Sequence, residues 1–148
     1  MQKKNILFIC VHNSARSVMA EALCNHFCEE SVVAQSAGLA PGKLNPFAVE
    51  ALHEIGLEIG GKQPQSVQEV LDRGEKFDYV ITVCSESEAE GCPIFPGKTT
   101  HLHWPFPDPS QFEGDDELRL ARTRAVRNLI RDKVEAWCQE QGFCLNAA

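Results

Sequence analysis

A cysteine and an arginine stand where a buried strand is expected to end and a helix to begin. They are Cys10 and Arg16, in the run C-V-H-N-S-A-R, and Ser17 follows directly. The unpaired N–H groups of such a loop and the dipole of the following helix favour a bound anion, and an arginine can clamp an oxyanion through paired hydrogen bonds. The same surroundings favour the thiolate form of a cysteine. The pattern therefore predicts Cys10 as a nucleophile inside an oxyanion cradle.

The other residues of the loop support this prediction. The hydroxyl of Ser17 can donate a hydrogen bond to the sulfur of Cys10, and Asn13 suits either a left-handed backbone position or a hydrogen bond that fixes the loop. The alternative is a buried cysteine at a strand end, with Arg16 in a surface ion pair. We predict that the whole loop binds the substrate: Val11, His12, Asn13, Ser14, Ala15, Arg16 and Ser17.

Asp108 is the candidate proton donor. It lies in the proline-rich run P-F-P-D-P-S, after the last expected strand, so its carboxyl group can reach over the ends of the strands. A departing oxygen needs a proton, and a carboxyl group held beside an anion can supply it as a general acid. The alternative is an ordinary turn aspartate before a proline.

Two further cysteines, Cys84 and Cys92, are separated by a polar stretch that can form a short helix. If Cys10 carries a covalent adduct, Cys84 can resolve it and pass the resulting disulfide to Cys92 by thiol exchange. Two alternatives stay open: both thiols are incidental, or they form a zinc site with His101 and His103. The C-x7-C-x8-H-x-H spacing is poor for zinc, so we expect no metal.

The hydrophobic pattern predicts the elements that hold these residues. Strands and helices alternate, which is typical of an α/β domain whose parallel sheet has helices on both faces. Ligands in such domains bind outside the carboxyl ends of the strands, where Cys10 and Cys84 are expected. The expected strands are residues 5–9, 31–38, 77–84 and 100–104, and the expected helices follow the first loop and cover 45–56, a short stretch from Ser66, and 115–141.

The last of these helices, residues 115–141, is expected to cover the sheet. Its apolar side chains recur at helical spacing, and Gly142 follows as a stop. The predicted buried stripe consists of Leu118, Ala121, Ala125, Leu129, Val134 and Trp137.

Composition narrows the class of protein. The 148 residues suffice for one domain, 1–148, and contain no long apolar segment or export signal, so we expect a soluble, cytoplasmic protein. A formal charge of −7 argues against electrostatic binding to nucleic acid or an anionic membrane. Seven cysteines in such a chain predict reduced thiols, metal ligands or redox chemistry rather than a disulfide framework. Four are expected to be buried and unreactive: Cys24, Cys28, Cys138 and Cys144.

Six segments spread over nearly the whole chain carry a resemblance to a known family: "FICVHNSARSVMAEAL", "SAGL", "NPFAVEALHEIGLEI", "FDYVITVC", "CPIFPG" and "HWPFPDP". They resemble the low-molecular-weight protein tyrosine phosphatases and, among these, the thioredoxin-coupled arsenate reductases. The resemblance implies a four-stranded parallel sheet, with Cys10 as nucleophile, Arg16 as oxyanion binder and Asp108 as general acid. Two positions depart from the common pattern: His12 stands where a glycine is usual, and Ala15 replaces a second loop cysteine.

The function implied by the resemblance is the reduction of arsenate to arsenite. It would proceed through a relay of Cys10, Cys84 and Cys92, with electrons from thioredoxin and no bound cofactor. The alternative within the family is a phosphatase that hydrolyses phosphotyrosine through a phosphocysteine, which needs neither Cys84 nor Cys92. The expected partners are an arsenate or phosphate-type oxyanion and thioredoxin.

One question about a cation stays open. Glu21 and Ser36 match positions that line a potassium site in some related reductases, but Gln63 and Gln65 replace the residues expected to complete it. The sequence therefore predicts no particular ion there.

Overall fold

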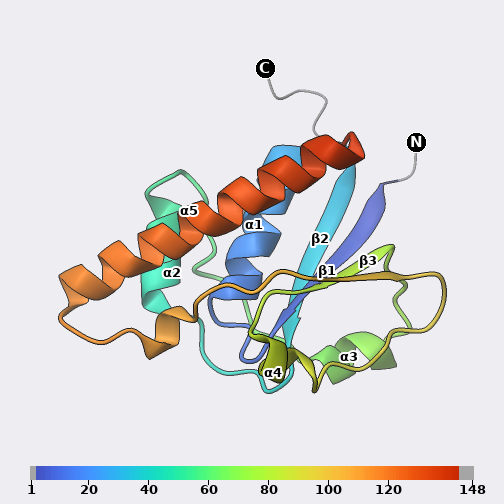
Figure 1. Cartoon of the computed structure of the whole chain (residues 1–148), viewed down its shortest axis with the longest axis horizontal. Coiled ribbons are helices and arrows are strands. Elements are labelled where there is room, and N and C mark those ends of the chain that lie inside the picture. The colour runs from blue at the N-terminus through green and yellow to red at the C-terminus, as the bar shows by residue number, and fades with distance from the viewer. Residues whose placement is uncertain (1–2, 144–148) are drawn as a thin grey trace.

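One parallel sheet of four strands forms the centre of the computed structural model, which describes residues 3–143 (Figure 1). The strands are β1 (Lys4–Cys10), β2 (Val32–Gly38), β3 (Tyr79–Thr82) and β4 (Thr100–His103), in the order β2-β1-β3-β4. The register pairs Cys10 with Gly38, Ile9 with Thr82, and Thr82 with His103. The carboxyl ends of all four strands therefore lie together at one end of the sheet, and the predicted sheet is confirmed.

Helices cover both faces of this sheet, as predicted. α1 (Arg16–Cys28), α2 (Pro46–His53) and α5 (Asp116–Gln141) lie on one side, and Figure 1 shows α5 crossing over the other two. α3 (Val67–Asp72) lies on the opposite side, α4 (Glu86–Ala89) follows β3, and a 3-10 turn, Pro109–Gln111, follows β4. Within residues 3–143, no helix combines the length and the apolar character needed to cross a membrane.

The core follows from the alternation of side chains along β1. Ile6 and Phe8 point into a cluster with α1 and α5, whereas Leu7 and Ile9 point into a second cluster with α3. All four side chains are fully buried, as expected for a central strand that is covered on both faces. This packing fixes β1, and with it the position of Cys10 at the end of the strand.

Capping residues set the starts of two helices near that end of the sheet. Asn45 accepts hydrogen bonds from two backbone N–H groups at the start of α2, and Pro46 is the first helical residue. Ser66 caps α3 through the N–H of Glu69. The helices predicted at both positions are confirmed, although α2 already ends at His53.

The prediction for α5 is right in extent but only partly right in its buried stripe, of which Val134 and Trp137 are confirmed. Leu118 and Leu129 are 44% and 51% exposed. Arg127 is buried instead, because its guanidinium donates to the carbonyl oxygen of Ala51 and pairs with Glu54 at the end of α2. The stripe that faces the core is therefore partly polar and consists of Thr123, Val126, Arg127, Ile130, Val134, Trp137 and Cys138.

Three of the four cysteines predicted to be inert lie in the core. Cys24, Cys28 and Cys138 are buried in the cluster between the sheet, α1 and α5. Cys24 and Cys138 are free thiols, whereas Cys28 is disulfide-bonded rather than free. Cys144 lies outside the described residues.

Candidate active site

The segment after β2 holds the loop between β1 and α1 through hydrogen bonds to the carbonyl oxygens of the loop. Four of them accept hydrogen bonds of 2.7 to 3.1 Å from backbone N–H groups of the segment 39–45. Because C=O and N–H point in opposite directions across a trans peptide, the N–H groups of these peptides point away from segment 39–45, toward the inside of the loop. The amide of Asn13 reaches that sulfur at 3.2 Å. The loop is thus a cradle of donors around Cys10, which can hold an anion.

Gly38 allows the segment after β2 to approach this loop. A Cβ at position 38 would lie 2.7 Å from the carbonyl oxygen of Val11 and 2.8 Å from the amide nitrogen of Asn13. Atoms of that kind do not approach so closely, so only a glycine fits here without moving the loop. The sequence pattern marks Gly38 only as the end of a strand; its packing against the loop becomes visible in the structure.

Asn13 fixes the shape of the loop in both of the ways that its sequence position suggested. Its backbone is left-handed, with φ of 52°. Its side-chain oxygen accepts from the N–H of Gln65, and its amide nitrogen therefore donates to Ser17 at 2.8 Å and to Ser36 at 2.9 Å. Since the Ser17 oxygen already accepts from Asn13, the proton of its hydroxyl is left for the sulfur of Cys10, 2.9 Å away. The sulfur is thus placed to accept two hydrogen bonds, which fix its position inside the loop.

His12, at the position where related loops have a glycine, does not disturb the cradle. Its backbone φ is not left-handed, so the side chain causes no strain there. The imidazole lies outside the loop, where Nδ1 donates to the carbonyl oxygen of Ala40 at 3.0 Å. His12 therefore adds a further tie between the loop and the segment after β2.

Arg16 is a buried cation at the mouth of the cradle, and its side chain is only 4% exposed. Its guanidinium lies 3.3 Å from a carboxylate oxygen of Glu88 and 3.4 Å from one of Asp108, and it also donates to the carbonyl oxygen of Phe106. Arg16 is therefore buried rather than in a surface ion pair. It joins three segments that are far apart in the chain: the loop, α4 and the stretch after β4.

Asp108 caps a turn, as one of its two interpretations predicted, and it also faces the anion cradle. One carboxylate oxygen caps the 3-10 turn, because it accepts from the backbone N–H and the hydroxyl of Ser110 at 3.0 and 2.8 Å. The other oxygen is the one that faces Arg16. The turn therefore aims a carboxyl group over the anion cradle, where it can exchange a proton with a bound oxyanion.

Cys84 lies beside the cradle, two residues after β3, which ends at Thr82 rather than at Cys84 as predicted. Its side chain is fully buried, and burial is the main reason why the pKa of the thiol rises to about 11. The charge of Arg16 acts in the opposite direction, whereas Glu88 and Cys10 add to the rise. The N–H of Val83 donates to the carbonyl oxygen of Ile9 at 2.8 Å, so Cys84 and Cys10 follow neighbouring positions of two paired strands, and both belong to the same buried cluster.

Cys92 lies apart from this group. It lines a pocket of about 420 Å³ over β3 and β4, and its thiol donates to the carbonyl oxygen of Pro93. Burial raises its pKa as well. The four-residue helix α4 stands between the two cysteines in the chain, and they pack into different core clusters, Cys84 into the one with α1 and α5 and Cys92 against the one with α3.

The two histidines of the weighed zinc site are engaged with the protein. His103 Nδ1 is hydrogen-bonded to the hydroxyl of Thr82, and His101 Nε2 accepts from the N–H of Phe95. In the part of the chain that the structure describes, no three His, Cys, Asp or Glu side chains are grouped so that they could hold a metal ion. The geometry gives the zinc alternative no support.

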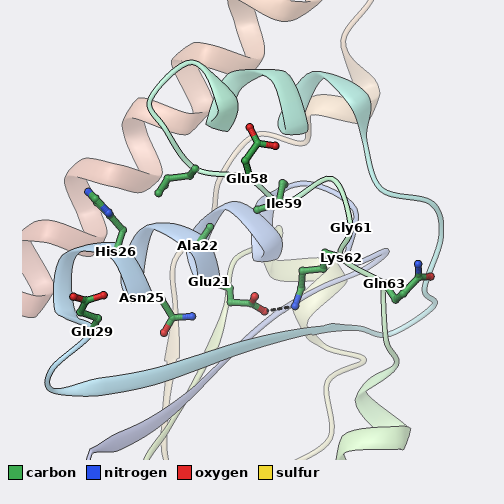
Figure 2. A pocket seen from close by; sticks show the side chains of 11 residues that line it. Glu21, Ala22, Asn25, His26, Glu29, Glu58, Ile59, Gly61, Lys62 and Gln63 are labelled. Carbon is green, nitrogen blue, oxygen red and sulfur yellow. Dashed lines mark ion pairs between the residues drawn. The ribbon is translucent and has the colours of Figure 1, made fainter.

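A second group of residues is linked to the cradle by hydrogen bonds. Its central member is Lys62, which the sequence analysis did not predict. The hydroxyl of Ser36 donates to Glu21 at 2.8 Å, and the ammonium group of Lys62 lies 2.7 Å from the same oxygen. Figure 2 shows Glu21 from α1 and Lys62 from the segment after α2 pointing toward each other in a pocket of about 630 Å³. The cation beside Glu21 is thus a side chain of the protein. From Glu21, which pairs with Lys62, a chain of hydrogen bonds passes through Ser36 and Asn13 to Ser17 and Cys10.

Lys62→Met is expected to weaken both the fold and the cradle. The carboxylate of Glu21 is only 14% exposed, and a hydrogen bond to such a charged group contributes about 1.5–3 kcal/mol. We expect the free energy of unfolding to fall by about that amount in chemical denaturation, and phosphate affinity to fall several-fold. Lys76→Met, at an exposed lysine far from the loop, is the control. If the two variants behave alike, Lys62 does not support the loop.

Comparisons with known proteins find relatives that match this chain over most of its length. The arsenate reductase of Halalkalibacterium halodurans is 36% identical over 140 residues, which is 94% of this chain and 98% of the relative. The solved structure of an arsenate reductase from Archaeoglobus fulgidus is 35% identical, with a TM-score of 0.66 over 88% of this chain and 98% of that one. A thioredoxin-dependent arsenate reductase from Corynebacterium glutamicum is 29% identical, with a TM-score of 0.60 over 90% of this chain and 63% of that one.

The family is shown by a match over almost the entire described structure. Residues 5–142 match the family described as low molecular weight phosphotyrosine protein phosphatase. This range contains the loop with Cys10 and Arg16, both further cysteines of the site and Asp108. The chain belongs to the low-molecular-weight phosphotyrosine protein phosphatase family, and its relatives within it include arsenate reductases.

Proposed function

We propose that this chain is an arsenate reductase that draws its electrons from thioredoxin. The observation that carries the proposal is Cys84, a buried thiol placed beside Cys10 and Arg16. A hydrolytic phosphatase has no use for a thiol in that position, whereas a reductase needs one there. The relatives named arsenate reductase, which match more than nine-tenths of the chain, support the same choice of substrate.

In the first step, Cys10 attacks the arsenic of a bound arsenate. The inward N–H groups of the loop and the guanidinium of Arg16 hold the oxygens that do not react, and they stabilise the charge that develops on them. A sulfur–arsenic bond forms while an arsenic–oxygen bond breaks. Asp108 gives its proton to the departing hydroxyl, which leaves as water.

In the second step, the thiolate of Cys84 attacks the sulfur of Cys10. The sulfur–sulfur bond forms as the sulfur–arsenic bond breaks, and the electron pair of that bond stays on arsenic. Arsenic is thereby reduced from the +5 to the +3 state and leaves as arsenite. The two thiols are oxidised together to a disulfide, so the electrons balance.

In the third step, Cys92 attacks Cys84 and releases Cys10 as a thiolate. The disulfide then joins Cys84 to Cys92, on a segment with exposed side chains, where thioredoxin can reduce it. Support for thioredoxin comes from the relative in Corynebacterium glutamicum that is named thioredoxin-dependent. The direct test is arsenate-dependent oxidation of NADPH with thioredoxin and thioredoxin reductase, run beside a glutaredoxin system. Turnover with glutaredoxin alone would contradict the proposed donor.

The second step should speed up with pH. The pKa of Cys84 is raised to about 11, mainly by burial, so only a small fraction of this thiol is ionised at neutral pH. That fraction grows about tenfold for each pH unit below the pKa, and only the thiolate attacks. Single-turnover release of arsenite by the Cys92→Ser variant should therefore accelerate about tenfold between pH 7 and 8. A flat profile would show that Cys84 is ionised before it attacks.

A further inference from the structure

The guanidinium proposed to bind the oxyanion is already held by a carboxylate from α4. An oxygen of Glu88 lies 3.3 Å from the Nη1 atom of Arg16. The same oxygen accepts a hydrogen bond from the backbone N–H of Ser85 at 3.0 Å. One atom thus links the anion cradle to the start of α4.

Glu88 brings a negative charge to the place where a negative substrate must bind. Burial disfavours ionisation of Glu88, but the hydrogen bonds from Ser85 and Arg16 outweigh burial and lower the pKa of its carboxyl group. Glu88 is therefore a carboxylate at neutral pH. An arsenate or phosphate ion carries charge of the same sign and needs the same donor, so the two compete for Arg16.

α4 is held by this contact, by its cap and by the packing of the half-buried Ala89 against the core. It spans four residues, none of them buried, and a single turn of helix is not stable by itself. Its capping box consists of the Ser85 hydroxyl, which accepts from the N–H of Glu88, and the Glu88 carboxylate, which accepts from the N–H of Ser85. A loss of the Glu88 contacts would therefore loosen the helix that lies between Cys84 and Cys92.

We propose that Glu88 is a positioning residue that couples oxyanion binding to release of the Cys92 segment. The oxyanion displaces Glu88 from Arg16, the capping box weakens, and α4 unwinds so that Cys92 can approach Cys84. The segment is thereby freed only when a substrate occupies the cradle, which protects the thiols from exchange in its absence. This inference rests on the proposed function, because it takes Arg16 as the oxyanion binder.

The first test measures the competition. Glu88→Gln removes the charge but keeps an oxygen that can accept from the N–H of Ser85. We expect inorganic phosphate to bind this variant about five- to tenfold more tightly than the wild type in titration calorimetry. Glu86→Gln is the matched control, since Glu86 lies on the same helix and is exposed, and its affinity should equal that of the wild type.

The second test measures the coupling. In the wild-type protein, saturating phosphate should raise the rate at which iodoacetamide labels Cys92 several-fold, as followed by mass spectrometry of the Cys92 peptide. In Glu88→Gln, the rate should be the same with and without phosphate. A merely structural role of Glu88 would change the rate in the variant but would not remove its response to phosphate.

The outcomes separate this inference from the proposed function. If the wild type binds phosphate, but Glu88→Gln binds it equally and phosphate leaves Cys92 labelling unchanged in the wild type, the coupling is wrong and the oxyanion site stands. If the wild type binds no phosphate, the oxyanion site and the coupling are both overturned.

Discussion

Cys10→Ser is expected to lower both arsenate reduction and the hydrolysis of aryl phosphates to background, a loss of at least about 1,000-fold. The sulfur of Cys10 is placed to accept hydrogen bonds from the hydroxyl of Ser17 and the amide of Asn13, which fix its position inside the loop. A serine hydroxyl stays protonated in the same place and is a far weaker nucleophile. Single-turnover formation of arsenite and steady-state hydrolysis of para-nitrophenyl phosphate would measure the two losses.

Phosphate binding is the control for this variant. The donors of the loop and Arg16 do not depend on the sulfur, so the variant should bind phosphate within a few-fold of wild-type affinity and unfold at a similar temperature. Lost activity with retained binding would assign the sulfur to the chemistry. Substantial activity in the variant would remove Cys10 as the nucleophile.

The parts of the site that the sequence predicted are those that depend on residues close together in the chain. The buried run before Cys10 specifies a central strand. The loop that follows has free N–H groups, which can bind an anion. Asn13 had two local interpretations, and the structure shows both. Asp108 caps a turn and also faces Arg16, and its role as general acid stays a prediction. At such positions a single side chain serves the backbone with one group and the site with another.

The parts that the sequence did not predict depend on contacts between distant segments. Glu88 meets Arg16 across 72 positions of the chain, and nothing near either residue indicates the pair. Lys62 meets Glu21 in the same way, from a segment without regular structure. The buried stripe of α5 was predicted only in part for a related reason, because α2 and its C-terminal end supply partners that allow Arg127 to be buried. Hydrophobic periodicity alone does not reveal such partners.

Cys84→Ser separates the two enzymes that this site could serve. Reduction of arsenate takes two electrons, which water cannot give, so an arsenic adduct on Cys10 must be resolved by a second thiol. A phosphate on Cys10 needs only water and Asp108. The variant should therefore form no arsenite above background, whereas slow hydrolysis of an activated aryl phosphate should persist. Cys24→Ser is the matched control, since Cys24 is an equally buried thiol that lies outside the site and is hydrogen-bonded to Cys138.

Cys92→Ser should arrest the same relay one step later. Cys84 can still attack Cys10, but the resulting disulfide has no next thiol, so the enzyme should complete one turnover and stop. Mass spectrometry should then find a loss of about 2 Da, the two hydrogens of a new disulfide, confined to the peptides of Cys10 and Cys84. If Cys84→Ser instead cycles with thioredoxin at the wild-type rate, the thiol relay is wrong. A phosphatase that hydrolyses a phosphocysteine would then be the better account of this site.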